Sequence, residues 1–154
     1  MNVNYGQGTT YPKPKEQPVR WITVDAKDAI LGRLASEVAK RLMGKHNPHY
    51  HPAVMTGDHV IIINADKIKV TGNKSETKEF IWHTGYAGHL RRRPYEKQMA
   101  MSPAKAFELT IRGMLPKNKL GRKMLNNLRV FAGEAHNLDA QKPEVVDIKS
   151  VRNA

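Results

Sequence analysis

The sequence contains no cysteine, which excludes disulfide bonds and thiolate chemistry. No window approaches the roughly 20 apolar residues that a membrane-spanning helix needs. The first 18 residues lack the apolar core of a secretory signal. A chain of 154 residues suits one domain with a real core. We therefore expect a cytoplasmic protein that has no membrane partner and no cofactor.

Acidic residues are scarce in one part of the chain. Between residues 81 and 129 there are eleven cationic residues and only two acidic ones, so this part carries +9 of the formal net charge of +12. Such an asymmetry indicates a polyanionic partner rather than a general need for solubility.

The densest basic cluster is the segment 112–123, which has no acidic residue. Its cations are Arg112, Lys117, Lys119, Arg122 and Lys123. Apolar residues recur at helical spacing before and after a turn at Pro116–Asn118, so two amphipathic helices should meet here. Charges anchored on both sides should be fixed in space, unlike those of a mobile basic tail.

A second basic segment runs from His83 to Arg93. Its two glycines allow close backbone approach to a partner, and Tyr86 offers a ring for stacking. The triplet Arg91, Arg92 and Arg93 offers planar forks for phosphate oxygens. We predict a loop whose arginines are mobile until RNA orders them.

A third candidate is the loop between Lys45 and Pro52. Lys45, His46, His49 and Tyr50 suit stacking and hydrogen bonding on unpaired bases. Histidines this close together can also bind zinc, but a fourth ligand is not evident. We therefore favour RNA over a metal here.

The hydrophobic pattern predicts an α/β fold. A β-rich run at 19–25 precedes a helix over 31–42, with Gly44 at its C-cap. Val60–Ile63 is apolar without alternation, which is typical of a central parallel strand that is buried on both faces. A further strand is predicted at 130–132, followed by a loose segment from residue 134 onward.

An enzyme is the main alternative. Thr71–Ser75 resembles half of a phosphate-binding loop, but the upstream glycine is missing. Asp25, Asp58 and Asp66 lie near predicted strand ends, as they do at ordinary strand-to-loop junctions. A membrane-surface protein is a weaker alternative, because the cations cluster in loops and junctions rather than along one amphipathic helix.

Several short motifs occur together in a fixed order. They are Leu31–Ser36, Gly57–Asp58, Ile63–Ala65, His83–Tyr86, Arg112–Pro116, Leu120–Arg122 and Ala140–Pro143. Through them, from about Trp21 to Pro143, the chain resembles the universal large-subunit ribosomal protein family numbered thirteen, in its bacterial form.

The resemblance implies a three-layer α/β/α domain with a small, mostly parallel sheet. It implies direct binding to large-subunit rRNA, an early role in subunit assembly, and neighbouring ribosomal proteins as further partners. It implies no catalysis and no small-molecule substrate. Outside the resemblance, residues 1–18 are rich in Gly, Pro, Thr and Lys, so we expect a flexible arm there. We expect a single rRNA-binding domain over 19–143 and a tail over 144–154.

Overall fold

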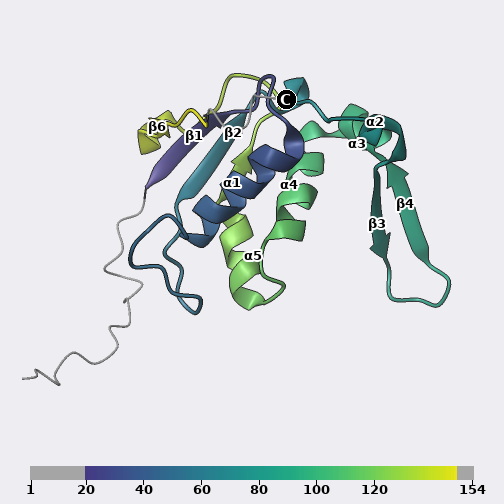
Figure 1. Ribbon diagram of the computed structural model, residues 1–154, viewed down its shortest axis with the longest axis horizontal. Helices are drawn as coiled ribbons and strands as arrows, with labels where there is room; N and C mark the ends of the chain where they lie inside the picture. Colours follow the sequence, from purple (N-terminus) through teal and green to yellow (C-terminus); the bar gives the residue numbers. More distant parts are fainter. Residues whose placement is uncertain (1–19, 149–154) are drawn as a thin grey trace, which may run out of the picture.

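The centre of the protein is a four-stranded sheet (Figure 1). The structure is a computed structural model that describes residues 20–148. The arm predicted over 1–18 lies outside these residues. The strand order is β5-β2-β1-β6, and every pair of neighbours is parallel. The strands are β1 (Trp21–Asp25), β2 (His59–Ile63), β5 (Leu128–Val130) and β6 (Glu144–Val145).

Strand β2 occupies the centre of the sheet, as its sequence predicts. Val60, Ile61 and Ile62 are completely buried, and β2 is paired with β1 on one side and β5 on the other. The helix predicted over 31–42 is α1 (Leu31–Met43), whose buried stripe joins the core. Gly44 ends this helix in the left-handed conformation, with φ of 81°.

The long helices cover one face of the sheet. The chain crosses from β1 to β2 to β5 in one direction, so right-handed crossovers place the intervening helices on one face. These are α1, α4 (Pro103–Met114) and α5 (Lys119–Asn126), which contact one another. The single turn η3 (Asp139–Gln141) lies on the other side (Figure 1). The predicted α/β fold with a mostly parallel sheet is confirmed.

A smaller unit projects from this body. Between β2 and α4 lie η2 (Ala65–Lys67), α2 (Lys74–Thr77), β3 (Glu79–His83), β4 (Leu90–Pro94) and α3 (Tyr95–Met101). Strands β3 and β4 form an antiparallel hairpin, and Phe80 at its base stacks at 6.4 Å on Tyr95. Burial of Tyr95 raises the pKa of its hydroxyl.

The end of the described chain differs from the prediction. The segment from residue 134 is not loose throughout, because Glu144–Val145 forms β6 and pairs with Ile22–Thr23 of β1. The amide of Val146 then donates to the carbonyl of Thr23 at 2.9 Å. The strand predicted at 130–132 begins two residues earlier, at Leu128, where the side chain is buried against the core.

Candidate nucleic-acid interface

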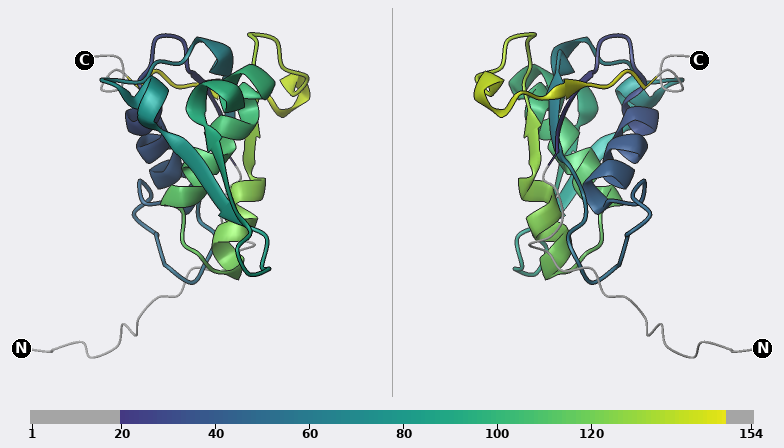
Figure 2. Two further views of the ribbon diagram at one scale, coloured as in Figure 1. Left: turned by 90° about the vertical axis from the view of Figure 1, so that its right-hand side faces the viewer. Right: turned by 90° about the vertical axis from the view of Figure 1, so that its left-hand side faces the viewer.

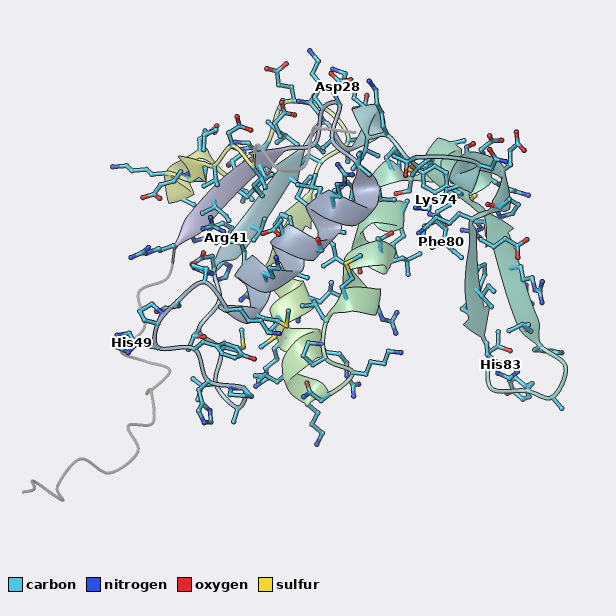
Figure 3. All side chains as sticks on the ribbon, viewed as in Figure 1. Asp28, Arg41, His49, Lys74, Phe80 and His83 are labelled. Atoms are coloured by element: carbon cyan, nitrogen blue, oxygen red, sulfur yellow. The ribbon has the colours of Figure 1, made fainter. Side chains whose placement is uncertain are left out.

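Three segments lie at the same end of the molecule. They are the loop 45–52 after α1, the tip of the β3–β4 hairpin, and the junction between α4 and α5. Figures 1 and 2 show all three at the lower end, where β1 and β2 begin. His49 and His83, labelled in Figure 3, mark two of them, whereas Asp28 and Lys74 lie at the opposite end. We call this lower end the basic edge.

The α4–α5 junction is held by apolar contacts on both sides. Ile111 and Leu115 are buried before it and Met124 after it. Asn118 caps α5, since its Oδ1 accepts a hydrogen bond from the amide of Gly121 at 2.7 Å. The prediction that two helices meet here is confirmed, and the junction is part of the packed fold.

All five predicted cations of the junction are exposed. They are Arg112, Lys117, Lys119, Arg122 and Lys123. None of them forms an ion pair with any residue between 20 and 148. Elsewhere lysines do pair with acids, as Lys40 does with Glu37 at 2.6 Å. The junction therefore presents uncompensated positive charge on a fixed backbone.

Gly121 packs closely against the backbone of Pro116 in the junction. A Cβ built on it would collide with the carbonyl oxygen of Pro116, whereas a Cβ on Gly113 would meet nothing within 4 Å. Gly121→Ala is expected to lower the free energy of unfolding by about 1–3 kcal/mol, as forced overpacking does. Gly113→Ala, the control, should be neutral or slightly stabilising, because alanine favours a helix. Urea unfolding of both variants measures this; equal stabilities would contradict the close packing.

The second basic segment, residues 83–93, differs from its prediction as a loop because its arginines lie in a hairpin. Arg91, Arg92 and Arg93 follow the glycine-containing turn but do not lie in a loop themselves; they form strand β4 and pair with Trp82, Ile81 and Phe80 of β3. A run of charged residues gives no alternating pattern, so the strand was not evident in the sequence.

The three arginines differ in their surroundings. Arg93 donates from Nη1 to Oε1 of the buried Gln98 at 2.8 Å and lies 5.1 Å from the Trp82 ring. Arg92 lies 3.7 Å from a carboxylate oxygen of Glu79. Arg91 is exposed and forms no ion pair within the described part of the chain. Of the three arginines, Arg91 is thus the one most available to an RNA phosphate.

The tip of the hairpin is a tight turn that presents one aromatic ring. Gly85 and Gly88 have φ values of 96° and 73°, which L side chains rarely adopt. The Nδ1 of His83 accepts from the amide of Gly85 at 2.9 Å. Tyr86 is 73% exposed, with the ring of His89 at 5.9 Å. The turn therefore holds Tyr86 outward as a stacking surface.

The loop 45–52 contributes unevenly. Lys45 and His49 are exposed and Tyr50 is half-buried. His46 is exposed as well, but its side chain, 28% exposed, lies with its Nε2 3.0 Å from the carboxylate of the buried Asp58. His46 therefore ties the loop to the start of β2 and is less available to RNA than its neighbours.

An uncharged aromatic pair lies next to this loop. The Trp21 ring stacks on His59 at 4.4 Å. Burial, and after it the positive charge of Arg129, lowers the pKa of His59, while Asp58 acts in the opposite direction. His59 is thus neutral near pH 7 and adds no charge to the basic edge.

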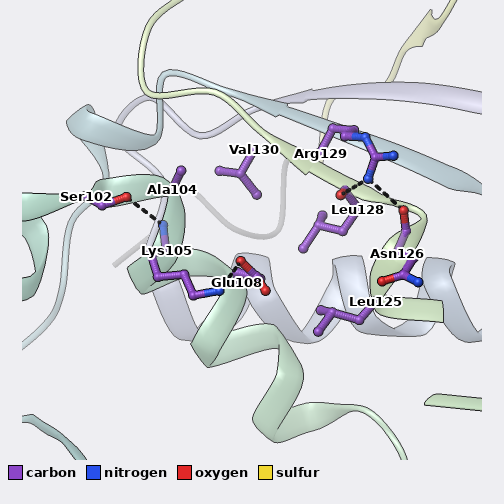
Figure 4. A pocket seen from close by; sticks show the side chains of 9 residues that line it. All are labelled: Ser102, Ala104, Lys105, Glu108, Leu125, Asn126, Leu128, Arg129 and Val130. Atoms are coloured by element: carbon purple, nitrogen blue, oxygen red, sulfur yellow. Dashed lines mark hydrogen bonds and ion pairs between the residues drawn. The ribbon is translucent and has the colours of Figure 1, made fainter. Parts of the chain in front are cut away.

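One hollow on the body lacks the features of a binding site. It has a volume of about 340 Å³ and lies between the start of α4 and β5 (Figure 4). Its Lys105 pairs with Glu108 at 2.8 Å, and Arg129 donates to the carbonyls of Asn126 and Leu128. Both cations of the hollow are therefore engaged within the chain.

Sequence reasoning missed Trp82 as a candidate site residue. It lies on the same face of the hairpin as Arg91 and Arg93 and is 39% exposed. Phe80 and Trp82 alternate with polar neighbours, a pattern typical of a half-exposed strand, and this pattern alone does not indicate a contact with RNA.

The chain is similar to known proteins over most of its length. The family model described as Ribosomal protein L13 matches residues 19–137. The protein named large ribosomal subunit protein uL13 of Thermobifida fusca is 50% identical over 144 residues, covering 94% of this chain and 97% of that protein. The proteins of the same name from Thioalkalivibrio sulfidiphilus and Pseudoalteromonas atlantica are 48% and 49% identical, covering 88% and 91% of this chain and 96% and 99% of their own. Within residues 20–148 no helix is long and apolar enough to cross a membrane.

Proposed function

Since the chain belongs to the ribosomal protein L13 family of the large subunit and is not an enzyme, we propose that it binds large-subunit rRNA directly through the basic edge. We further propose that it does so early in subunit assembly, in the cytoplasm, before contacts with neighbouring ribosomal proteins are complete.

One observation carries the proposal: the basic edge concentrates cations that have no acidic partner. No acidic residue occurs between Glu108 and Glu134, and the five cations of the junction are exposed and without ion pairs among residues 20–148. Uncompensated charge of one sign disfavours the compact state, so its retention on a fixed surface points to a polyanion that neutralises it.

The segments of the edge suit different parts of an RNA. The exposed cations of the junction suit phosphate oxygens, which fix the register of the protein on its target. Tyr86 at the hairpin tip suits an unpaired base, since aromatic rings stack on bases splayed from a loop. Lys45, His49 and Tyr50 extend this surface on the other side of the junction.

A surface made by the protein's own fold supports an early role. The junction is fixed by core packing and the Asn118 cap, so it needs no second protein to order it. Pre-positioned groups lose little entropy on binding. The basic edge is therefore competent to bind rRNA before its protein neighbours arrive.

The salt dependence of binding tests this function. Affinity for a large-subunit rRNA fragment should fall linearly in log–log form between ~50 and ~200 mM salt, by about 10³-fold if six phosphates are contacted. An unrelated RNA of equal length should show a similar slope but weaker binding at every salt concentration. An affinity for the rRNA fragment that does not change with salt would contradict the phosphate-contact model.

A further inference from the structure

A groove separates the hairpin from α4. It has a volume of about 360 Å³, within the roughly 300–1,000 Å³ of ligand pockets. Strand β3 forms one wall and α4 the other; Phe80, labelled in Figure 3, marks its upper end. The side chains that matter for its chemistry are Trp82, Arg93, Gln98, Lys105 and Arg112.

The groove pairs an aromatic ring with cations. Arg93 covers part of the Trp82 ring at 5.1 Å, and its guanidinium is held by Gln98, which is 3% exposed. Arg112 enters from α4 and makes no ion pair within residues 20–148. Lys105 is already paired with Glu108, and no carboxylate lines the groove. Its two arginines are therefore the charges available to a ligand.

This arrangement fits one nucleotide. An aromatic ring offers a plane for a base, and arginine offers a planar fork for its phosphate. A groove of this size excludes a double helix but admits a single base. Arg112 also belongs to the junction cluster, so a strand entering the groove continues over the cations of the basic edge.

We propose that the groove between β3 and α4 binds a single unpaired nucleotide of RNA, with its base on the Trp82–Arg93 pair and its phosphate on Arg112. The site rests on the proposed rRNA binding and adds to it a pocket that selects single-stranded over paired RNA. It also gives the hairpin a partner: a two-stranded hairpin is marginally stable alone, and this one exposes 39% of Trp82.

The chain has two tryptophans, so Trp21→Phe leaves Trp82 as the only one and makes its fluorescence a direct reporter. Titration with a short single-stranded RNA should quench this fluorescence in a saturable way. A blunt duplex of the same sequence, at the same salt concentration, should leave it nearly unchanged.

Three variants complete the test with the rRNA fragment. Trp82→Ala should weaken binding by about 5- to 150-fold without changing the salt slope, because stacking releases no counterions. In the Trp21→Phe protein, Arg112→Gln should weaken the saturable quenching of Trp82 by single-stranded RNA, and this readout keeps the test valid if Trp82→Ala disturbs the hairpin. Leu90→Ala is the control, since Leu90 is 52% exposed on the same hairpin and does not line the groove. It should bind normally.

The outcomes separate this site from the general function. If the protein binds the rRNA fragment while Trp82 fluorescence and the affinity of Trp82→Ala stay unchanged, the nucleotide site is wrong and rRNA binding stands. If Trp82 responds to ribosomal proteins but not to RNA, the groove is a protein contact and the proposal is overturned. If the unaltered protein does not bind rRNA at all, both the proposed function and this site fail.

Discussion

Replacing Ile62 with aspartate is expected to unfold the domain. Ile62 is completely buried in the central strand, paired with Val24 on one side and Val130 on the other. An unpaired carboxylate there would cost several kcal/mol, or would have to be neutralised, and total stabilities are only about 5–15 kcal/mol. Thermal unfolding followed by circular dichroism should show no cooperative transition.

Val145→Asp is the matched control for this variant. Val145 is also β-branched and lies in the same sheet, but it is 82% exposed in strand β6. Surface changes of this kind usually alter stability by about 0.5 kcal/mol or less. An unchanged melting temperature for Ile62→Asp would contradict the placement of β2 in the core.

The second large effect is expected at the α4–α5 junction. Replacing Lys117, Lys119, Arg122 and Lys123 together with glutamine should weaken rRNA binding by ~100-fold or more. A hydrogen bond to a charged group contributes roughly 1.5–3 kcal/mol, so the removal of two such bonds suffices. The salt slope should fall by about one for each phosphate that the variant no longer binds, and association should slow because steering charge is removed. Filter binding and surface-immobilised RNA kinetics measure these quantities.

The control removes the same charge from the opposite end of the molecule. The four lysines are Lys27, next to Asp28 in the sequence, Lys67 in η2, Lys69, which pairs with Asp28 at 2.8 Å, and Lys74 at the start of α2. Asp28 and Lys74 are labelled at this end of the molecule in Figure 3. Their replacement with glutamine should leave the salt slope nearly unchanged. Equal losses of affinity in the two variants would show that net charge matters and the junction does not.

Much of the body could be predicted because its signals are local. Val60–Ile63 is apolar without alternation, and only a strand covered on both faces uses such a run. Serine directly before proline is a typical helix start, and at Ser102–Pro103 the Ser102 hydroxyl does accept from the amide of Lys105 at the start of α4. Patterns of this kind are sufficient because they depend on residues that are close together in the sequence.

Other elements were missed because their stability comes from distant parts of the chain. Glu144–Val145 has no strand pattern of its own and forms β6 because β1 offers an open edge. Arg91–Arg93 is a strand because β3 lies beside it and α3 anchors its base. The local sequence propensity of a segment does not indicate whether a distant strand will pair with it.

The candidate site divides in the same way. The cations of the junction were predictable, since their density and the flanking helical spacing are sequence properties. The contact of His46 with Asp58 was not, because Asp58 comes twelve residues later in the chain. The groove with Trp82 and Arg112 was not either, because it exists only where a hairpin and a helix from separate segments come together.

Photocrosslinking tests the central claim that the basic edge contacts rRNA. The full chain would be irradiated with large-subunit rRNA, and the crosslinked peptides identified by mass spectrometry. We expect crosslinks in the segments 45–52, 82–93 and 112–123, with Tyr86 among the modified residues. Crosslinks confined to the opposite end, in residues 65–78, would contradict the account.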